Sequence, residues 1–279
     1  MAFIVPISHC GTMQRFPALF LGWWLALVGM VASAAESAPE LPPRERFHLY
    51  VLIGQSNMAG RGMLDPAAAV SSERVLKYTS EEGWAPGTEP LHAKKPGKGG
   101  AGLAASFARA MADAEPDVTI GLIPCAVGGT PLSRWMKGGD LYEKAVHRTR
   151  KAMHDGTLKG ILWHQGESDS KQEETARTYG DRLADMVTDL RDDLGVGEVP
   201  FVAGHLGQFV SSPKHAGKYA YSQVVEDHLT ALPGRVPCAA VVESTGLAAK
   251  QDELHFDTPS LREFGTRYAA AMQRLLESN

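Results

Sequence analysis

Five short apolar runs alternate along the chain with longer amphipathic patterns. The runs show little polar alternation, which is typical of strands buried on both faces of a parallel sheet. Strands that alternate with helices fold into a sheet covered by helices on both faces. The sequence therefore predicts a three-layer α/β/α sandwich with strands at residues 47–53, 118–124, 158–164, 199–205 and 236–243.

The helices expected between these strands have apolar positions three and four residues apart, which is the spacing of one helix face. The segment 65–96 is rich in Pro, Gly and charge, so we expect a long loop over the strand ends there. The predicted helices span residues 102–114, 141–154, 173–194, 219–232 and 259–276.

The amino terminus is different in kind. Residues 16–31 form an almost uninterrupted apolar run that follows Arg15 and precedes Ala32-Ser33-Ala34-Ala35, a pattern typical of a cleaved secretory signal. A membrane anchor is the alternative, but the run is short for a span of about 20 residues. We expect a signal peptide over residues 1–35, a Pro-rich linker over 36–46 and one domain over 47–279, in a secreted or periplasmic protein without a stable membrane anchor.

The net charge and the cysteine content limit which ligands and cross-links we expect. The formal net charge of −4 gives no basic surface for nucleic acid, so a neutral or small substrate fits better. After cleavage Cys125 and Cys238 remain, both in apolar runs where a thiol behaves as a small core residue, with a disulfide as the alternative. No spacing of Cys or His is typical of a metal site, and we expect neither metal nor cofactor.

A candidate nucleophile ends the first apolar run, in Gly54-Gln55-Ser56-Asn57-Met58. Ser56 lies just past the carboxyl end of a predicted strand, which is where open α/β sheets bind their ligands. A serine in that place is more often a helix cap or a turn residue. Ser56 alone is therefore weak support for catalysis.

A candidate base precedes the last predicted helix, in Asp252-Glu253-Leu254-His255-Phe256-Asp257. An aspartate three residues before a histidine can reach the imidazole and fix its tautomer, which leaves the other ring nitrogen to take the proton of Ser56. The alternative is a polar loop whose carboxylates only cap the helix. Ser56, His255 and Asp252 could together form a catalytic triad.

Two more segments offer hydrogen-bond donors for the charge that develops on a substrate oxygen. Trp163-His164-Gln165-Gly166-Glu167-Ser168-Asp169 closes the third predicted strand, and the amide of Gln165 could donate to that oxygen. Ala126-Val127-Gly128-Gly129-Thr130 follows the second strand and offers backbone N–H groups that no side chain obstructs. A parallel sheet would bring the four segments to one edge.

These four segments resemble the sequence blocks of the SGNH hydrolases, in the branch of sialate O-acetylesterases and acetylxylan esterases. The resemblance covers nearly all of residues 47–279 and implies a flavodoxin-like parallel sheet and serine esterase chemistry. It implies that Ser56 is the nucleophile, His255 the general base and Asp252 its orienting acid. It also implies an oxyanion hole made by the N–H groups of Ser56 and Gly128 and the side chain of Gln165.

The sequence leaves two of these assignments open. Many members of the superfamily have asparagine where this chain has Gln165, so the reach of the longer side chain is unsettled. Glu167 could replace Asp252 as the acid partner of His255, or it could support its own loop. We favour Asp252, because it is three residues from His255 and a contact over so short a loop costs little conformational entropy.

The sequence thus predicts a secreted serine esterase that removes O-acetyl groups from a polysaccharide or from sialic acid. The alternatives are an esterase acting on lipid or aryl esters and a non-catalytic carbohydrate-binding protein. The sequence does not identify the acetylated glycan or the oligomeric state, because loop shape sets specificity.

Overall fold

The computed structural model describes residues 39–64, 72–92 and 99–278. The predicted signal peptide over residues 1–35 lies outside the described residues. Within those residues, no helix is both long and apolar enough to cross a bilayer.

A seven-stranded sheet runs through the molecule in the order β3-β2-β4-β1-β5-β6-β7. All neighbouring strands are parallel except β2 and β3, which form an antiparallel pair at one edge. The five strands expected from the sequence are β4, β1, β5, β6 and β7, and their spatial order is the flavodoxin-like one. The strands are β1 (Phe47–Gly54), β2 (Val75–Tyr78), β3 (Trp84–Pro86), β4 (Thr119–Pro124), β5 (Thr157–His164), β6 (Phe201–Gly204) and β7 (Ala239–Val242).

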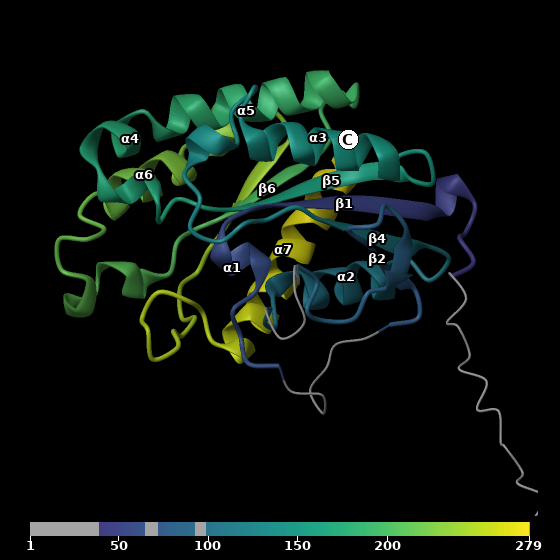
Figure 1. The fold of residues 1–279 in the computed structure, drawn as a ribbon, viewed down its shortest axis with the longest axis horizontal. Helices are drawn as coiled ribbons and strands as arrows, with labels where there is room; N and C mark the ends of the chain where they lie inside the picture. The colour runs from purple at the N-terminus through teal and green to yellow at the C-terminus, as the bar shows by residue number, and fades with distance from the viewer. Residues whose placement is uncertain (1–38, 65–71, 93–98, 279) are drawn as a thin grey trace, which may run out of the picture. The chain divides into compact units, whose positions relative to one another are not determined.

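Helices cover both faces of this sheet, as Figure 1 shows, with α3 and α5 on one side and α2 and α7 on the other. The α-helices are α1 (Ser56–Ala59), α2 (Leu103–Ala114), α3 (Asp140–Ala152), α4 (Glu173–Arg177), α5 (Tyr179–Leu194), α6 (Ser222–Thr230) and α7 (Thr258–Glu277). Short 3-10 helices lie at Arg44–Arg46, Leu132–Arg134, Asp169–Lys171, Gln208–Ser211, Pro213–His215 and Leu232–Gly234. The architecture is the predicted three-layer α/β/α sandwich.

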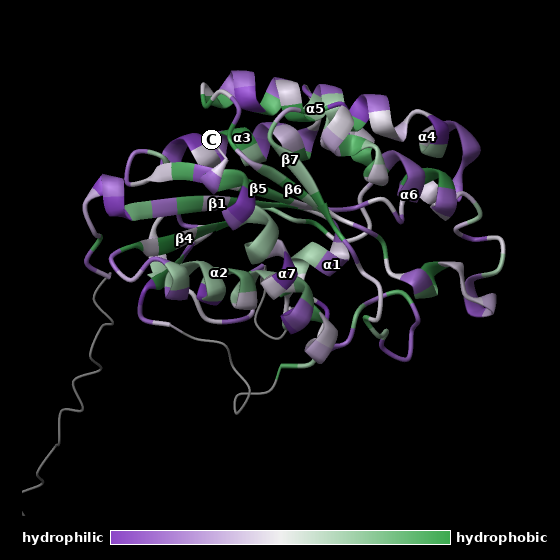
Figure 2. Ribbon diagram, turned by 180° about the vertical axis from the view of Figure 1, so that it is seen from behind, coloured by the Kyte–Doolittle hydropathy of each residue, from purple (hydrophilic) through white to green (hydrophobic). Residues whose placement is uncertain are grey.

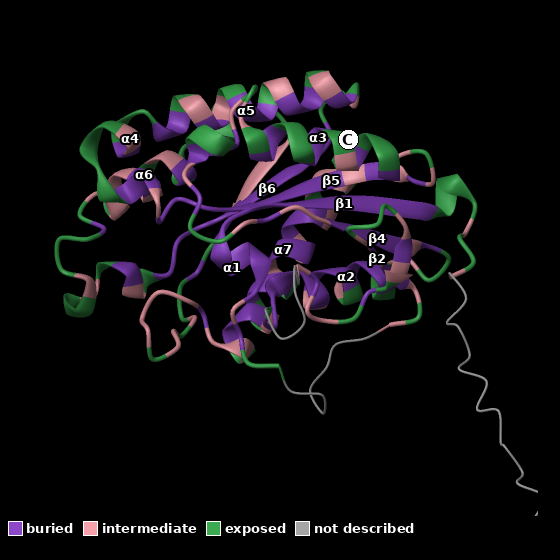
Figure 3. Ribbon diagram, in the orientation of Figure 1, coloured by how far each residue is buried: buried purple, intermediate pink, exposed green. Residues whose placement is uncertain are grey.

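The central strand β1 explains why the chain has two apolar layers. All eight of its residues are buried, and successive side chains point to opposite faces of the sheet. Leu49 and Val51 pack in the core beneath α3 and α5, whereas Tyr50 and Leu52 pack in the core beneath α2 and α7. Apolar residues follow the strands and the inner helix faces in Figure 2, and Figure 3 shows the same strands buried between exposed helix surfaces.

Two expectations about local structure are wrong. The segment 65–96 was expected to be a loop, but it contains β2 and β3, because Val75 and Leu76 are buried against β4 and complete the sheet. The single helix expected over residues 173–194 is divided at Thr178 into α4 and α5. The Thr178 hydroxyl donates to the backbone oxygen of Glu174 at 2.9 Å, and Thr178 has a ψ of 1°, which leaves the helical region.

Candidate active site

The ends of the three central strands bring the predicted segments together. In the sheet register Gly54 of β1 lies opposite His164 of β5, and the N–H of Val127 donates to the oxygen of Gly54 at 3.0 Å. The N–H of Gln55 donates to the oxygen of His164 at 2.8 Å, so the chain turns toward α1 while still bonded to β5. Gly54 has a φ of 126°, and a Cβ there would overlap the carbonyl oxygen of His164. Only glycine permits this close approach.

Ser56, His255 and Asp252 form a continuous hydrogen-bonded chain at this edge of the sheet. The distance from Ser56 Oγ to His255 Nε2 is 3.0 Å, and the distance from His255 Nδ1 to Asp252 Oδ2 is 2.8 Å. Because an ionised carboxylate can only accept, Nδ1 carries the ring proton and Nε2 is left to accept from the serine hydroxyl. The geometry is that of a nucleophile, its base and the acid that orients the base.

The carboxylate of Asp252 is held in its ionised form. Burial raises its pKa, but hydrogen bonds from the His255 ring and from the N–H groups of His255 and Leu254 outweigh burial and lower the pKa to about 2. Both N–H groups donate to Oδ1, at 2.9 Å from His255 and 3.0 Å from Leu254. One oxygen of Asp252 therefore shapes the loop while the other orients the imidazole.

Glu167 does not contact the ring of His255, but it is linked to the loop that carries it. Its Oε1 accepts from Asn57 Nδ2 at 2.8 Å. The same Asn57 side chain donates to the oxygen of Leu254 at 3.3 Å and accepts from the N–H of Phe256 at 3.2 Å. Asn57 thus clamps the backbone on both sides of His255, and Glu167 supports Asn57.

The carboxyl of Glu167 is almost fully buried, with 1 % of its surface exposed. Burial raises its pKa to about 7, although the hydrogen bond from Asn57 opposes this rise. His164 Nε2 lies 3.9 Å from Glu167 Oε1, yet burial lowers the pKa of His164 to about 3. His164 is therefore neutral near pH 7, and the two residues do not form an ion pair.

Gln165 is the predicted site residue that the structure places differently. Its Nε2 donates to the oxygen of Thr130 at 3.1 Å and to Asp169 Oδ2 at 2.7 Å. A side-chain amide has two hydrogens to donate, so none is left for a substrate oxygen. In this structure Gln165 ties the Thr130 segment to the Asp169 loop, and its role in an oxyanion hole stays a prediction.

The two backbone donors expected for an oxyanion hole do lie at the nucleophile. Ser56 is the first residue of α1, so its N–H is among those that have no partner within the helix. Gly128 lies beside it, since a Cβ at Gly128 would be 3.5 Å from the Cβ of Ser56. The same Cβ would overlap Nη2 of Arg61, which places a guanidinium next to Gly128.

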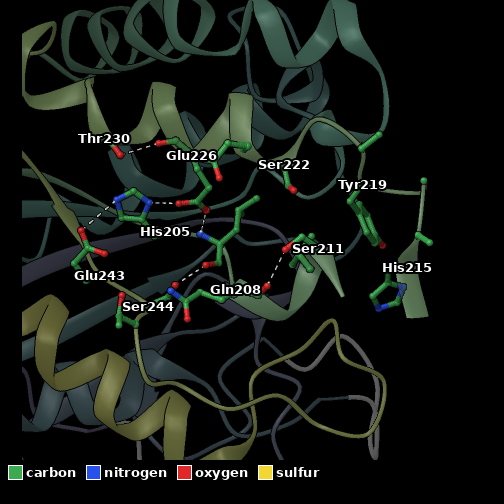
Figure 4. A pocket seen from close by; sticks show the side chains of 18 residues that line it. His205, Gln208, Ser211, His215, Tyr219, Ser222, Glu226, Thr230, Glu243 and Ser244 are labelled. Carbon is green, nitrogen blue, oxygen red and sulfur yellow. Dashed lines mark hydrogen bonds and ion pairs between the residues drawn. The ribbon is translucent and has the colours of Figure 1, made fainter. Parts of the chain in front are cut away.

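A cavity of about 640 Å³ opens beside the His255 loop, between the end of β6, α6 and the end of β7 (Figure 4). His205 lies in its wall between the carboxylates of Glu226 and Glu243. Burial lowers the pKa of His205, but these carboxylates outweigh burial and leave the pKa above its usual value. The ring of His215, which also lines the cavity, bonds to the backbone oxygen of Asp252 at 2.9 Å.

Several functional contacts were not found from the sequence. Asn57 stands next to the nucleophile, but nothing in the sequence indicates that it reaches Leu254 and Phe256. Asp169 follows Gln165 by four residues, and this spacing was the one available sign that the amide is engaged. Arg61 has no sequence pattern that indicates its contact with Gly128.

The two cysteines of the domain are not joined. Cys125 and Cys238 are both described and form no disulfide, and burial raises the pKa of the Cys125 thiol to about 11. Over the residues that the structure describes, no group of three or more His, Cys, Asp and Glu side chains is arranged to hold a metal ion.

The flavodoxin-like sheet, with a serine, a histidine and an aspartate joined at its carboxyl edge, defines a hydrolase of the SGNH type. A family model described as carbohydrate esterase, sialic acid-specific acetylesterase, matches residues 46–274. The chain belongs to this family of carbohydrate esterases.

Known proteins agree with this assignment. A probable carbohydrate esterase of Arabidopsis thaliana is 33% identical over 260 residues, which cover 85% of this chain and 94% of the relative. The crystal structure of an Arabidopsis thaliana protein matches with a TM-score of 0.73 and 30% identity, over 84% of this chain and 99% of that one. The structure of NanS shares the fold with a TM-score of 0.70 at 16% identity, over 86% of this chain and 100% of that one.

Proposed function

We propose that this protein is a serine esterase that removes O-acetyl groups from carbohydrate. The observation that carries the proposal is the hydrogen-bonded chain from Ser56 Oγ through His255 to Asp252. Membership of the carbohydrate esterase family supports both the ester chemistry and the carbohydrate substrate.

In the proposed reaction, Ser56 Oγ attacks the carbonyl carbon of the acetyl group while His255 Nε2 takes the hydroxyl proton. The N–H groups of Ser56 and Gly128 stabilise the negative charge on the carbonyl oxygen. The bond to the sugar oxygen then breaks, His255 returns the proton to that oxygen, and the acetyl group remains on Ser56. A water molecule then attacks the acetyl carbon while His255 takes its proton. The bond to Ser56 Oγ breaks, acetate leaves, and His255 returns the proton to Ser56.

The polar cavity beside the His255 loop supports a carbohydrate as the alcohol part of the ester. Its lining does not include Ser56 or His255, but the lining residue His215 bonds to the backbone oxygen of Asp252. Its lining includes the amides of Gln208 and Gln223 and the hydroxyls of Ser211 and Ser222. Such groups match the hydroxyls of a sugar, and the volume is in the range of small-molecule sites. Acetylated xylan and O-acetylated sialic acid are both candidate substrates.

We also propose that the protein is exported. The apolar run at residues 16–31 and the small residues Ala32-Ser33-Ala34-Ala35 support this. Sequencing the amino terminus of protein recovered from the native host would test it. A mature terminus near Glu36 is expected, and an intact Met1 would contradict export with cleavage.

Turnover of p-nitrophenyl acetate by the full chain tests the chemistry. Ser56→Ala is expected to lower kcat by about 10⁴-fold or more, because the nucleophile itself is removed. Ser278→Ala, which removes an exposed hydroxyl at the end of α7, is the matched control. Equal, weak rates in wild type and Ser56→Ala would mean background hydrolysis and would favour a carbohydrate-binding protein.

Acetate release from acetylated xylan and from O-acetylated sialic acid then tests the substrate. Turnover of at least one glycan, abolished by Ser56→Ala, is expected. An enzyme that hydrolyses only aryl or lipid esters would contradict the carbohydrate part of the proposal and leave the serine chemistry intact.

A further inference from the structure

The third donor that the sequence led us to expect, the side chain of Gln165, is engaged elsewhere in this structure. Both hydrogens of Gln165 Nε2 are engaged by Thr130 and Asp169, so the described site has two backbone donors, Ser56 and Gly128. A developing negative charge in a partly buried site is stabilised best by donors that already face it. The side chain of Arg61 lies next to one of these donors, Gly128, which itself lies beside Ser56.

Arg61 reaches this place because the chain turns sharply after α1. Gly60 has a φ of 87°, and Arg61 Nη1 donates back to the oxygen of Gly60 at 2.7 Å. The space that a Cβ of Gly128 would occupy is taken by Arg61 Nη2, and the same point lies 3.5 Å from the Cβ of Ser56. The guanidinium and the nucleophile therefore flank one position.

The charge of Arg61 has no carboxylate to balance it in the part of the chain that the structure describes. Arg61 is half-buried, and burial lowers its pKa without an opposing acidic neighbour. Arginine nevertheless keeps its proton in proteins, so the charge is permanent. A half-buried cation that has no carboxylate partner among the described residues is a favourable place for an anion.

The backbone of Arg61 is also fixed relative to the base. Lys250 Nζ donates to the oxygen of Arg61 at 2.7 Å, and the N–H of Lys250 donates to the oxygen of His255. The cation, the nucleophile and the His255 loop are therefore held by one set of contacts.

We propose that Arg61 is a catalytic residue that, through Nη2, stabilises the oxyanion formed when Ser56 attacks the acetyl group and binds the carboxylate of the acetate product. The inference rests on the proposed esterase function. During attack the carbonyl electron pair moves onto oxygen, the serine proton moves to His255, and Arg61 stays protonated throughout. The same guanidinium meets an acetate oxygen after hydrolysis, because guanidinium donors match carboxylate acceptors.

Two variants of the full chain test this with p-nitrophenyl acetate as substrate and sodium acetate as inhibitor. Arg61→Gln is expected to lower kcat by about 10²–10³-fold, the usual loss for one oxyanion donor. The inhibition constant for acetate should rise by about tenfold or more, as for the loss of one charged hydrogen bond. Arg61→Lys should show smaller losses in both kcat and acetate inhibition than Arg61→Gln, because lysine keeps the charge but not the planar guanidinium.

Arg177→Gln is the matched control, since it removes an exposed arginine of α4 that pairs with Glu173 of the same helix. Thermal unfolding of each variant shows that the fold is retained. A folded Arg61→Gln enzyme with kcat and acetate inhibition like those of wild type would overturn the proposal.

The Arg61 proposal and the esterase proposal can fail separately. If wild type and Ser56→Ala show the same background rate, the esterase proposal fails. Acetate binding to wild type and Arg61→Gln, measured by saturation-transfer NMR, still decides the anion site. Equal acetate binding by both proteins would overturn the role of Arg61 in that case too.

Discussion

Replacing Glu167 by glutamine should change how stability depends on pH. The carboxyl is buried, and one oxygen accepts from Asn57 Nδ2 at 2.8 Å. The other oxygen has no hydrogen-bond partner among the residues that the structure describes. Glutamine keeps an oxygen that can accept from Asn57, has nearly the same shape, and is neutral at every pH. The substitution therefore removes the ionisable group and keeps the hydrogen bond with Asn57.

The direction and size of the effect follow from the pKa of Glu167. Burial raises the folded-state pKa from 4.5 to about 7, so between these values the folded protein holds a proton that the unfolded chain has released. The free energy of unfolding therefore falls as pH rises through this window. At about 1.4 kcal/mol per pKa unit, the loss in wild type is about 3 kcal/mol, and Glu167→Gln should not show it.

Urea unfolding at pH 4.5 and pH 8 measures this loss. Between these pH values the midpoint of wild type should fall relative to that of Glu167→Gln by about 1 M, for a slope of about 2–3 kcal/mol per molar urea. Glu174→Gln is the control, because Glu174 is exposed on α4. If wild type and Glu167→Gln differ by the same amount at both pH values, Glu167 does not titrate as its burial requires.

Three further substitutions test the site and its support. Asp252→Asn should lower kcat by about 10²–10⁴-fold in the p-nitrophenyl acetate assay, because an amide no longer fixes the proton on His255 Nδ1, and a drop of only a few-fold would reject Asp252 as the orienting acid. Asn57→Ala should leave the N–H of Phe256 buried without a partner and lower the free energy of unfolding by at least about 2 kcal/mol. Calorimetry should then show a Tm lower by about 4–8 °C, and an unchanged Tm would rule out the clamp. Gly54→Ala should lower Tm far more than Gly217→Ala. Both glycines have positive φ, but only at Gly54 does a carbonyl oxygen lie where the Cβ would be. Equal losses of Tm would show that this close approach does not matter for stability.

The layers of the fold were predictable because burial leaves a local pattern. The five predicted strands lie in apolar runs of seven or eight residues, and each is followed by an amphipathic helix or its fragments. The antiparallel pair β2 and β3 has strands of only four and three residues. They lie in a segment rich in Pro, Gly and charge that has no apolar run of that length, and their place is set by the edge of β4.

The reacting groups were predictable where the chemistry is local in sequence. Asp252 and His255 are three residues apart, and the contact between them formed as expected. The contacts of Gln165 were not predictable, because the sequence showed an amide at a strand end but not the acceptors around it. Asp169 and Thr130 compete for the same two hydrogens and are already in place before any substrate arrives.

The clamp formed by Asn57 depends on contacts that no local pattern reveals. It joins residues 197 and 199 positions apart, and its support from Glu167 spans another 110. Because Asn57 directly follows Ser56, one short turn after β1 positions both the nucleophile and the backbone on either side of His255. A shift of this turn would move the serine and the His255 loop together. The distance between Ser56 Oγ and His255 Nε2 would therefore change less than if the two segments moved independently.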